Sequence, residues 1–181
     1  MKFSAALIAV AILAWPLAAL AADPVLPSTD PALSAQANAD YLAANAKKKG
    51  VIVKPDGLQI RMLQNGFGRR PAATDSVEVY YTGALINGKV FDGTSPGLPA
   101  NFKVSQVIPG WIEALQLMRE GDHWQIVIPS AIGYGSRGAG KSIPPDQTLV
   151  FDMTLVSSTP APRRGEPGYV PDPNDPDEKR Q

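Results

Sequence analysis

Apolar and polar residues alternate along two stretches in the first half of the chain. The apolar positions of these stretches are Leu58, Ile60 and Met62, followed by Val77, Val79 and Tyr81. A period of two residues is typical of β-strands that bury one face and expose the other. Two more apolar stretches, at residues 124–128 and 149–155, predict two further strands.

The dipeptide Asn87-Gly88 separates two short apolar segments, residues 84–86 and 89–91. An Asn-Gly pair favours the two-residue turn that joins neighbouring antiparallel strands, because both of its residues tolerate a positive φ. We therefore expect a β-hairpin at this point and an antiparallel arrangement of the sheet.

The period changes to that of a helix after Pro109. The apolar positions of one helical face are Trp111, Ala114, Leu115 and Met118, and Glu120-Gly121 predicts the end of the helix. Taken alone, such a stripe favours packing of Trp111 into the core. A tryptophan in the first turn also overhangs the helix end, where it can form the floor of a cavity.

A second helix is predicted over residues 31–49. Asp30-Pro31 combines an N-cap residue with a first-turn proline, and Gly50 follows three lysines that suit the negative end of the helix dipole. Its apolar stripe is thin, with Leu33 and Tyr41 as the bulky members. The helix can dock on the rest of the protein or form a weak dimer, so the sequence leaves a monomer and a weak homodimer open.

These elements predict an α+β fold, in which an antiparallel sheet of five to six strands is covered by one short helix. The sheet domain is predicted over residues 57–156, after an N-terminal linker and helix over residues 22–56. Residues 157–181 contain six prolines and nine charged residues, a composition that predicts a disordered tail.

The first 21 residues have the layout of a secretory signal peptide. Lys2 precedes an apolar run, and small residues stand on both sides of Leu20, which predicts cleavage after Ala21. A membrane anchor is the alternative, but Pro16 and the ending of the run favour removal. We therefore expect a periplasmic or secreted protein, without stable membrane insertion once the signal peptide is removed.

The composition excludes several classes of function. The chain has no cysteine, so it can form no disulfide and carry no lipid on a cysteine. Seventeen basic and seventeen acidic residues balance, which leaves no basic field for nucleic acid. The single histidine, His123, lies on the polar side of a predicted strand and is expected to be exposed. We expect no metal, no cofactor and no nucleic-acid partner.

Residues 135–142 match the phosphate-binding pattern G-x-x-x-x-G-K-[ST]. That pattern binds phosphate when a helix follows the loop, since the helix directs its backbone N–H groups at the anion. Here Ile143 is followed by Pro144-Pro145, which disfavours a helix beginning at Lys141. We interpret the match as chance, and nucleotide binding through Lys141 stays a minor hypothesis.

Six short motifs occur in order between residues 57 and 156. They are Val79-Tyr80-Tyr81-Thr82-Gly83, Phe91-Asp92, Val107-Ile108-Pro109-Gly110-Trp111, Ala131-Ile132-Gly133-Tyr134-Gly135, Ile143-Pro144-Pro145 and Thr148-Leu149-Val150-Phe151. Together they resemble the FKBP-type peptidyl-prolyl cis-trans isomerases. The preceding helix is similar to that of the exported, macrophage-infectivity-potentiator-like branch of this family.

The resemblance implies a half-barrel sheet wrapped around one helix, with an apolar cleft that binds an Xaa-Pro segment. The catalytic residues it implies are Tyr81, Phe91, Asp92, Ile108, Trp111, Tyr134 and Phe151, and the substrate-binding residues are Val107, Ile143 and Phe102. By the same resemblance, the Ile108 backbone N–H and the Tyr134 hydroxyl hold substrate carbonyls. Phe91 and Phe151 flank the proline ring, and Trp111 is the floor of the cleft.

Apolar and aromatic residues suit the rotation of an Xaa-Pro bond. Rotation about an Xaa-Pro bond faces a barrier of about 18–20 kcal/mol, because resonance keeps the amide planar and places charge on its oxygen. The twisted transition state is less polar, so an apolar cleft favours it without a nucleophile, an acid or a metal. Each ~1.4 kcal/mol of such preference changes the rate about tenfold.

The implied partners are Xaa-Pro-containing polypeptide clients, together with macrolide inhibitors of the tacrolimus and rapamycin type. The leading hypothesis is an isomerase that speeds slow Xaa-Pro steps in the folding of exported proteins. The alternative is a chaperone, holdase or assembly module that uses the same cleft, with incidental isomerisation. Ala139 and Ser142 are smaller than the rim residues of well-studied relatives, a departure that concerns substrate preference and macrolide affinity.

Overall fold

A computed structural model of the chain describes residues 28–162 and 166–167. The predicted signal peptide, residues 1–21, lies outside the described residues, and so does most of the tail predicted over residues 157–181. No helix within the described ranges combines the length and the apolar character needed to cross a bilayer.

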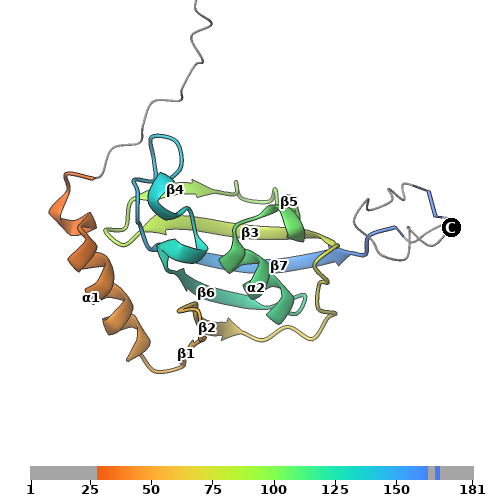
Figure 1. Ribbon diagram of the computed structural model, residues 1–181. Helices are drawn as coiled ribbons and strands as arrows, with labels where there is room; N and C mark the ends of the chain where they lie inside the picture. Colours follow the sequence, from red (N-terminus) through yellow and green to blue (C-terminus); the bar gives the residue numbers. More distant parts are fainter. Residues whose placement is uncertain (1–27, 163–165, 168–181) are drawn as a thin grey trace, which may run out of the picture.

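Seven strands form one antiparallel sheet in the order β1-β2-β6-β7-β3-β4, and β5 shares the outer edge of β3 with β4 (Figure 1). The strands are β1 (Val51–Val53), β2 (Gln59–Gln64), β3 (Ser76–Leu85), β4 (Val90–Gly93), β5 (Ala100–Lys103), β6 (His123–Ile128) and β7 (Leu149–Thr159). The predicted α+β class is confirmed. The sheet has seven strands instead of five or six, because the short strands β1 and β5 carry no clear sequence signal.

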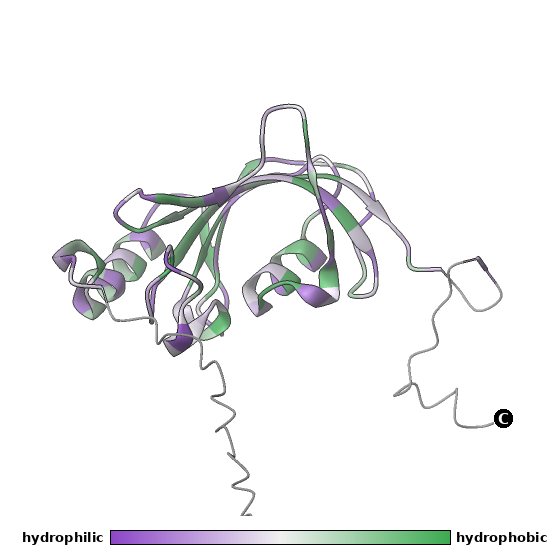
Figure 2. Ribbon diagram, turned by 90° about the horizontal axis from the view of Figure 1, so that it is seen from above, coloured by the Kyte–Doolittle hydropathy of each residue, from purple (hydrophilic) through white to green (hydrophobic). Residues whose placement is uncertain are grey.

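The sheet curves into an arch, with α2 (Pro109–Leu117) on its concave side and α1 (Ala35–Ala46) against its outer side (Figure 2). The apolar face of α2, including Ala114 and Leu115, packs on the concave side and forms the core with the strands. An ideal Cβ on Gly110 would lie 2.7 Å from Cγ2 of Ile128. The first turn of α2 therefore lies directly against β6, which brings Trp111 over the sheet.

The helix predicted over residues 31–49 divides into two parts. A 3₁₀ turn, Pro31–Leu33, comes first, and α1 begins after Ser34, whose Oγ accepts a hydrogen bond from the backbone N–H of Ala37. Asp30 caps the 3₁₀ turn by accepting from the backbone N–H of Ala32. The division arises because both Asp30 and Ser34 act as N-caps, four residues apart.

Hydrogen bonds between amide side chains hold α1 on the sheet. The buried Asn38 donates to Oε1 of Gln147 at 3.2 Å, and its Oδ1 accepts from the backbone N–H of Thr148 at 2.7 Å. About two turns further along the same face of α1, the buried Asn45 donates to Oε1 of Gln59 at 2.8 Å. These hydrogen bonds add to the few apolar contacts that α1 can make. The helix therefore docks on the sheet of its own chain.

Two further expectations can be compared with the structure. His123 is half-buried, not simply exposed, and its Nε2 lies 2.6 Å from Oδ1 of Asp152, because β6 and β7 place the two residues on one face. The loop that resembles a phosphate-binding pattern forms a 3₁₀ turn, Gly135–Arg137, and a bridge between Ala139 and Ile143. Residues 141–148, between this turn and β7, contain no helix, as Pro144-Pro145 predict.

Candidate active site

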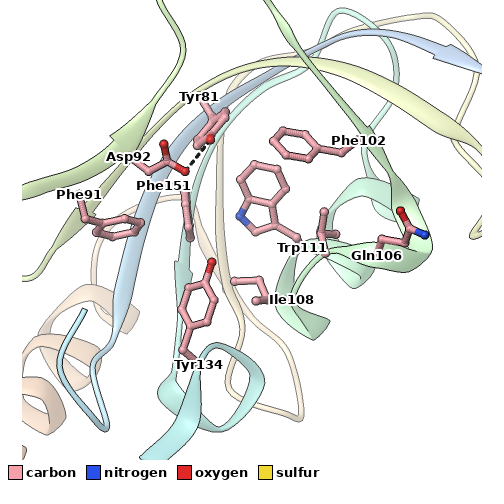
Figure 3. A pocket seen from close by; sticks show the side chains of 10 residues that line it. Tyr81, Phe91, Asp92, Phe102, Gln106, Ile108, Trp111, Tyr134 and Phe151 are labelled. Atoms are coloured by element: carbon pink, nitrogen blue, oxygen red, sulfur yellow. Dashed lines mark hydrogen bonds between the residues drawn. The ribbon is translucent and has the colours of Figure 1, made fainter. Parts of the chain in front are cut away.

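An aromatic pocket with a volume of about 370 Å³ opens on the concave side of the sheet (Figure 3). The residues that line it are Tyr81, Phe91, Asp92, Phe102, Gln106, Val107, Ile108, Trp111, Tyr134 and Phe151. They come from β3, β4, β5, β7, the segment that leads into α2, the first turn of α2 and the loop after β6. The fold thus gathers at one place residues that lie up to seventy positions apart.

Trp111 is at the centre of this pocket. Its ring centroid lies 5.0 Å from that of Tyr81, 5.2 Å from that of Phe151 and 5.4 Å from that of Phe102, each time close to perpendicular. Edge-to-face contacts of this kind add to the free energy gained from burial, by about 0.5–1.5 kcal/mol per pair. The indole is held from three sides and presents a fixed apolar floor.

Gly83 allows two rings to meet at one wall of the pocket. The rings of Phe91 and Phe151 contact edge to face, with centroids 5.6 Å apart. An ideal Cβ on Gly83 would lie 2.7 Å from atoms of both rings, closer than such atoms can approach. The missing side chain of Gly83 is therefore the reason that Phe91, on β4, can reach Phe151, on β7.

The rim of the pocket carries one polar pair. The hydroxyl of Tyr81 donates to Oδ2 of Asp92, and Oδ1 of Asp92 accepts from the backbone N–H of Gly93. Burial and the contact with Asp92 raise the pKa of Tyr81, and burial with the nearby Asp92 charge raises the pKa of Tyr134. Both hydroxyls therefore remain protonated donors at neutral pH.

Several donors at the pocket have no acceptor within the described part of the chain, including the buried indole Nε1–H of Trp111. The backbone N–H of Ile108, the residue that precedes α2, forms no hydrogen bond there, and neither does the hydroxyl of Tyr134. Figure 3 shows the Tyr134 hydroxyl pointing toward the aromatic rings. Unsatisfied donors beside an apolar surface are suited to donate hydrogen bonds to the carbonyl oxygens of a bound peptide.

Nine of the ten residues predicted for the site line this pocket. The exception is Ile143, which is 4% exposed and packs in the hydrophobic core. Gln106 lines the pocket without having been predicted, and Figure 3 shows it at the outer side, pointing away from the rings. Gln106 directly precedes the motif at residues 107–111, which is the one sequence feature that draws attention to it.

No cluster of three His, Cys, Asp or Glu side chains suited to a metal ion occurs in residues 28–162 or 166–167. The pocket itself contributes one carboxylate, that of Asp92, and otherwise aromatic, aliphatic and neutral polar groups. This set of side chains offers binding and desolvation for a neutral ligand.

Comparison with known proteins gives consistent matches. A family model described as FKBP-type peptidyl-prolyl cis-trans isomerase matches residues 68–156. The chain is 55% identical over 117 residues to the FKBP-type 22 kDa peptidyl-prolyl cis-trans isomerase of Escherichia coli, covering 64% of this chain and 57% of that protein. It is 49% identical over 118 residues to the outer membrane protein MIP of Legionella longbeachae, covering 65% and 51%.

Solved structures match as well. A peptidyl-prolyl cis-trans isomerase from Pseudomonas syringae superposes with a TM-score of 0.65 at 39% identity, covering 69% of this chain and 92% of that one. FkpA from Escherichia coli superposes with a TM-score of 0.67 at 40% identity, covering 70% and 60%. The chain spans about half the length of the curated relatives it matches.

Proposed function

The chain belongs to the FKBP-type peptidyl-prolyl cis-trans isomerase family, and we propose that it catalyses rotation about Xaa-Pro peptide bonds in its aromatic pocket. The observation that carries this proposal is the pocket itself, in which the buried indole of Trp111 forms an apolar floor below two unsatisfied donors. An apolar surface lowers the cost of the less polar, twisted amide, while the donors hold the neighbouring carbonyls.

Seven of the ten lining residues have a specific role in this proposal. Phe91 and Phe151 contact the two sides of the proline ring, and Trp111 contacts its face. The Ile108 backbone N–H and the Tyr134 hydroxyl donate hydrogen bonds to substrate carbonyl oxygens. Tyr81 and Asp92 maintain the rim through their hydrogen bond, which leaves the pocket without a free charge pointing at the substrate.

The substrates we propose are exported polypeptides that contain Xaa-Pro bonds. The signal-peptide layout of residues 1–21 supports export to the periplasm or beyond, and a relative in Legionella longbeachae bears the name outer membrane protein. The isomerase domain corresponds to residues 57–156. A pocket of this size also suits macrolides of the tacrolimus and rapamycin type, since ligand pockets commonly measure about 300–1,000 Å³.

The experiment that tests the proposal follows the cis-to-trans conversion of a short Xaa-Pro peptide. The protein used begins at Ala22, and neither metal nor nucleotide is added. We expect the wild type to accelerate the conversion and Phe91→Ala to reduce kcat/KM at least tenfold, because one wall of the pocket is lost. Tyr134→Phe should reduce it less, since the ring is kept and one hydrogen bond is lost.

Phe67→Ala is a matched control, because Phe67 is 93% exposed and lies outside the pocket. Circular dichroism checks that each variant is folded. A folded wild type without any acceleration would contradict the proposal and favour a binding module. Suppression of client aggregation is measured in parallel, and its survival in Phe91→Ala would indicate a separate chaperone function.

A further inference from the structure

A second groove lies at the other end of α2 from the aromatic pocket. Its volume is about 450 Å³, and it is formed by the end of β2 with the following loop, by the end of α2 and the segment after it, and by the start of β6. The lining residues are Met62, Asn65, Gly66, Phe67, Arg70, Leu117, Arg119, Asp122 and Trp124. None of these residues lines the aromatic pocket, so the groove is a separate surface.

The groove combines exposed apolar side chains with a buried tryptophan. Phe67 is 93% exposed between two glycines, and Met62 is about half exposed. Trp124 is 5% exposed, and its indole Nε1–H has no hydrogen-bond partner in the described part of the chain. Covering Phe67 would remove a large apolar surface from water, so an apolar or aromatic side chain suits this groove as a ligand.

Two arginines give the groove a positive charge. Arg70 and Arg119 are exposed, and neither forms an ion pair with a described residue. The one carboxylate of the lining, Asp122, is buried and already accepts hydrogen bonds from the backbone N–H groups of Gly66 and Arg119. The groove therefore favours a ligand that carries carboxylates of its own.

The C-terminal segment leaves the fold beside this groove. Arg69, the neighbour of Arg70, donates to the backbone carbonyl of Ser158 at 3.1 Å. The backbone N–H of Ala161 donates to Oδ1 of Asp75 at 3.3 Å, and Asp75 is in turn paired with Arg69. Figure 1 shows the segment between β2 and β3 passing beside the end of β7. Twenty residues follow Ala161 in the sequence.

Residues 169–178, which lie outside the described residues, have the composition that the groove favours. They begin with Tyr169 and Val170 and continue with the acidic residues Asp172, Asp175, Asp177 and Glu178, without a basic residue. The eight residues from Ala161 to Tyr169 can span up to about 26 Å, enough to reach a groove that adjoins Arg69.

We infer that residues 169–178 bind in this groove of the same molecule, with Tyr169 against Phe67 and the acidic residues beside Arg70 and Arg119. The groove is then an internal docking site for an acidic, aromatic peptide segment. This inference does not depend on isomerase activity, because the groove and the aromatic pocket share no residue.

Nuclear magnetic resonance tests the inference on the protein from Ala22 to Gln181 and on a version that ends at Pro162. Each contains two tryptophans, Trp111 in the aromatic pocket and Trp124 in the groove, so the two indole N–H signals report on the two sites. We expect removal of the tail to shift the Trp124 indole signal and the amide signal of Phe67, and to leave the Trp111 indole signal in place.

A synthetic peptide of residues 166–181, added to the shortened protein, should reproduce these shifts in a saturable manner. In the protein, Arg70→Glu combined with Arg119→Glu should weaken binding of the peptide at least tenfold. In the peptide, replacement of the four acidic residues in 169–178 by the corresponding amides should weaken binding by as much. Arg61→Glu is the matched control, since Arg61 is an exposed arginine on β2 and its side chain lies on the opposite face from Met62.

Several results would overturn the inference. Shifts of the Trp111 indole signal instead of the Trp124 signal would place the tail in the aromatic pocket. Shifts that disappear on dilution would mean that the tail of a second copy occupies the groove. Changes confined to residues 155–162, or equal binding of the peptide to the charge-reversed protein, would mean that the tail does not use the groove.

Discussion

The hydroxyl of Tyr81 donates a hydrogen bond of 2.7 Å to Oδ2 of Asp92, so that a residue of β3 is tied to a residue of β4 at the mouth of the aromatic pocket. The same tyrosine ring meets Trp111 edge to face, with centroids 5.0 Å apart. The polar rim and the apolar floor of the pocket are therefore connected through one side chain, and its hydroxyl and its ring can be tested separately.

Replacing Tyr81 with phenylalanine keeps the ring and removes this hydrogen bond. Of the two hydrogen bonds that the Asp92 side chain accepts, only the one from the backbone N–H of Gly93 then remains. We expect kcat/KM for an Xaa-Pro peptide to fall about three- to tenfold, in line with the loss of about one hydrogen bond. Tyr80→Phe, on the opposite face of β3, should leave kcat/KM unchanged; an equal loss there would mean that the effect arises elsewhere in the strand.

Gly83→Ala should damage the pocket and the stability together. The added methyl group would overlap the rings of Phe91 and Phe151. We expect a loss of about 1–3 kcal/mol in the free energy of unfolding, measured with urea, since overpacking forces side chains from their preferred rotamers. In a Phe91→Ala background the same substitution should cost less, and strictly additive losses would exclude contact with Phe91 as the cause.

Asp75 should contribute stability that depends on pH. Burial acts to raise the pKa of Asp75, but hydrogen bonds from the backbone N–H of Ala72 and from Arg69 outweigh it and hold that pKa below its usual range. A lowered pKa in the folded state means that the stabilisation is present above the pKa of the unfolded chain and is lost as the pH falls through the folded value.

Asp75→Asn is therefore expected to reduce the free energy of unfolding by about 1–3 kcal/mol at pH 7. The difference from the wild type should narrow as the pH falls below about 4. Urea unfolding at several pH values measures this, with the exposed Asp40→Asn as a control that should change stability by less than about 0.5 kcal/mol. A difference that stays constant down to pH 2 would show that the charge of Asp75 is not responsible.

Asn38→Ala should loosen α1 without affecting the aromatic pocket. The substitution leaves the backbone N–H of Thr148 and Oε1 of Gln147 without the partner that Asn38 provides. Hydrogen exchange of the α1 amides should accelerate at least tenfold, because a buried donor without an acceptor costs about 1–3 kcal/mol. Isomerase activity should be retained, since α1 lies outside the arch; Gln36→Ala, on the exposed face of α1, serves as the control.

The longer elements are predictable from sequence because their apolar period continues over several residues. β3 alternates over most of its ten residues, and α2 repeats one face over two turns. β1, by contrast, has three consecutive apolar residues and no alternation, while β5 has a single large apolar residue, Phe102. These two strands exist because β2 and β3 offer them unpaired edges, which no local pattern reveals.

The motifs predict most residues of the candidate site, but the fold determines which side chains face the pocket. Ile143 belongs to a motif, but the bridge between Ala139 and Ile143 turns its side chain into the core. Gln106 is a polar residue in a short 3₁₀ turn, and only its position beside the pocket distinguishes it. His123 meets Asp152 across two strands, at a sequence separation of 29 residues that gives no local signal.

Trp111 and Phe151 are 4% and 3% exposed, and they belong at once to the hydrophobic core and to the wall of the pocket. Small domains of this kind usually acquire their core packing in one cooperative step. The pocket then forms only in that step, and a partly folded chain has no partly competent pocket. The chain contains eighteen prolines, and a molecule whose own slow Xaa-Pro rotations are incomplete has no pocket of its own with which to speed them, so that only another, folded molecule can assist.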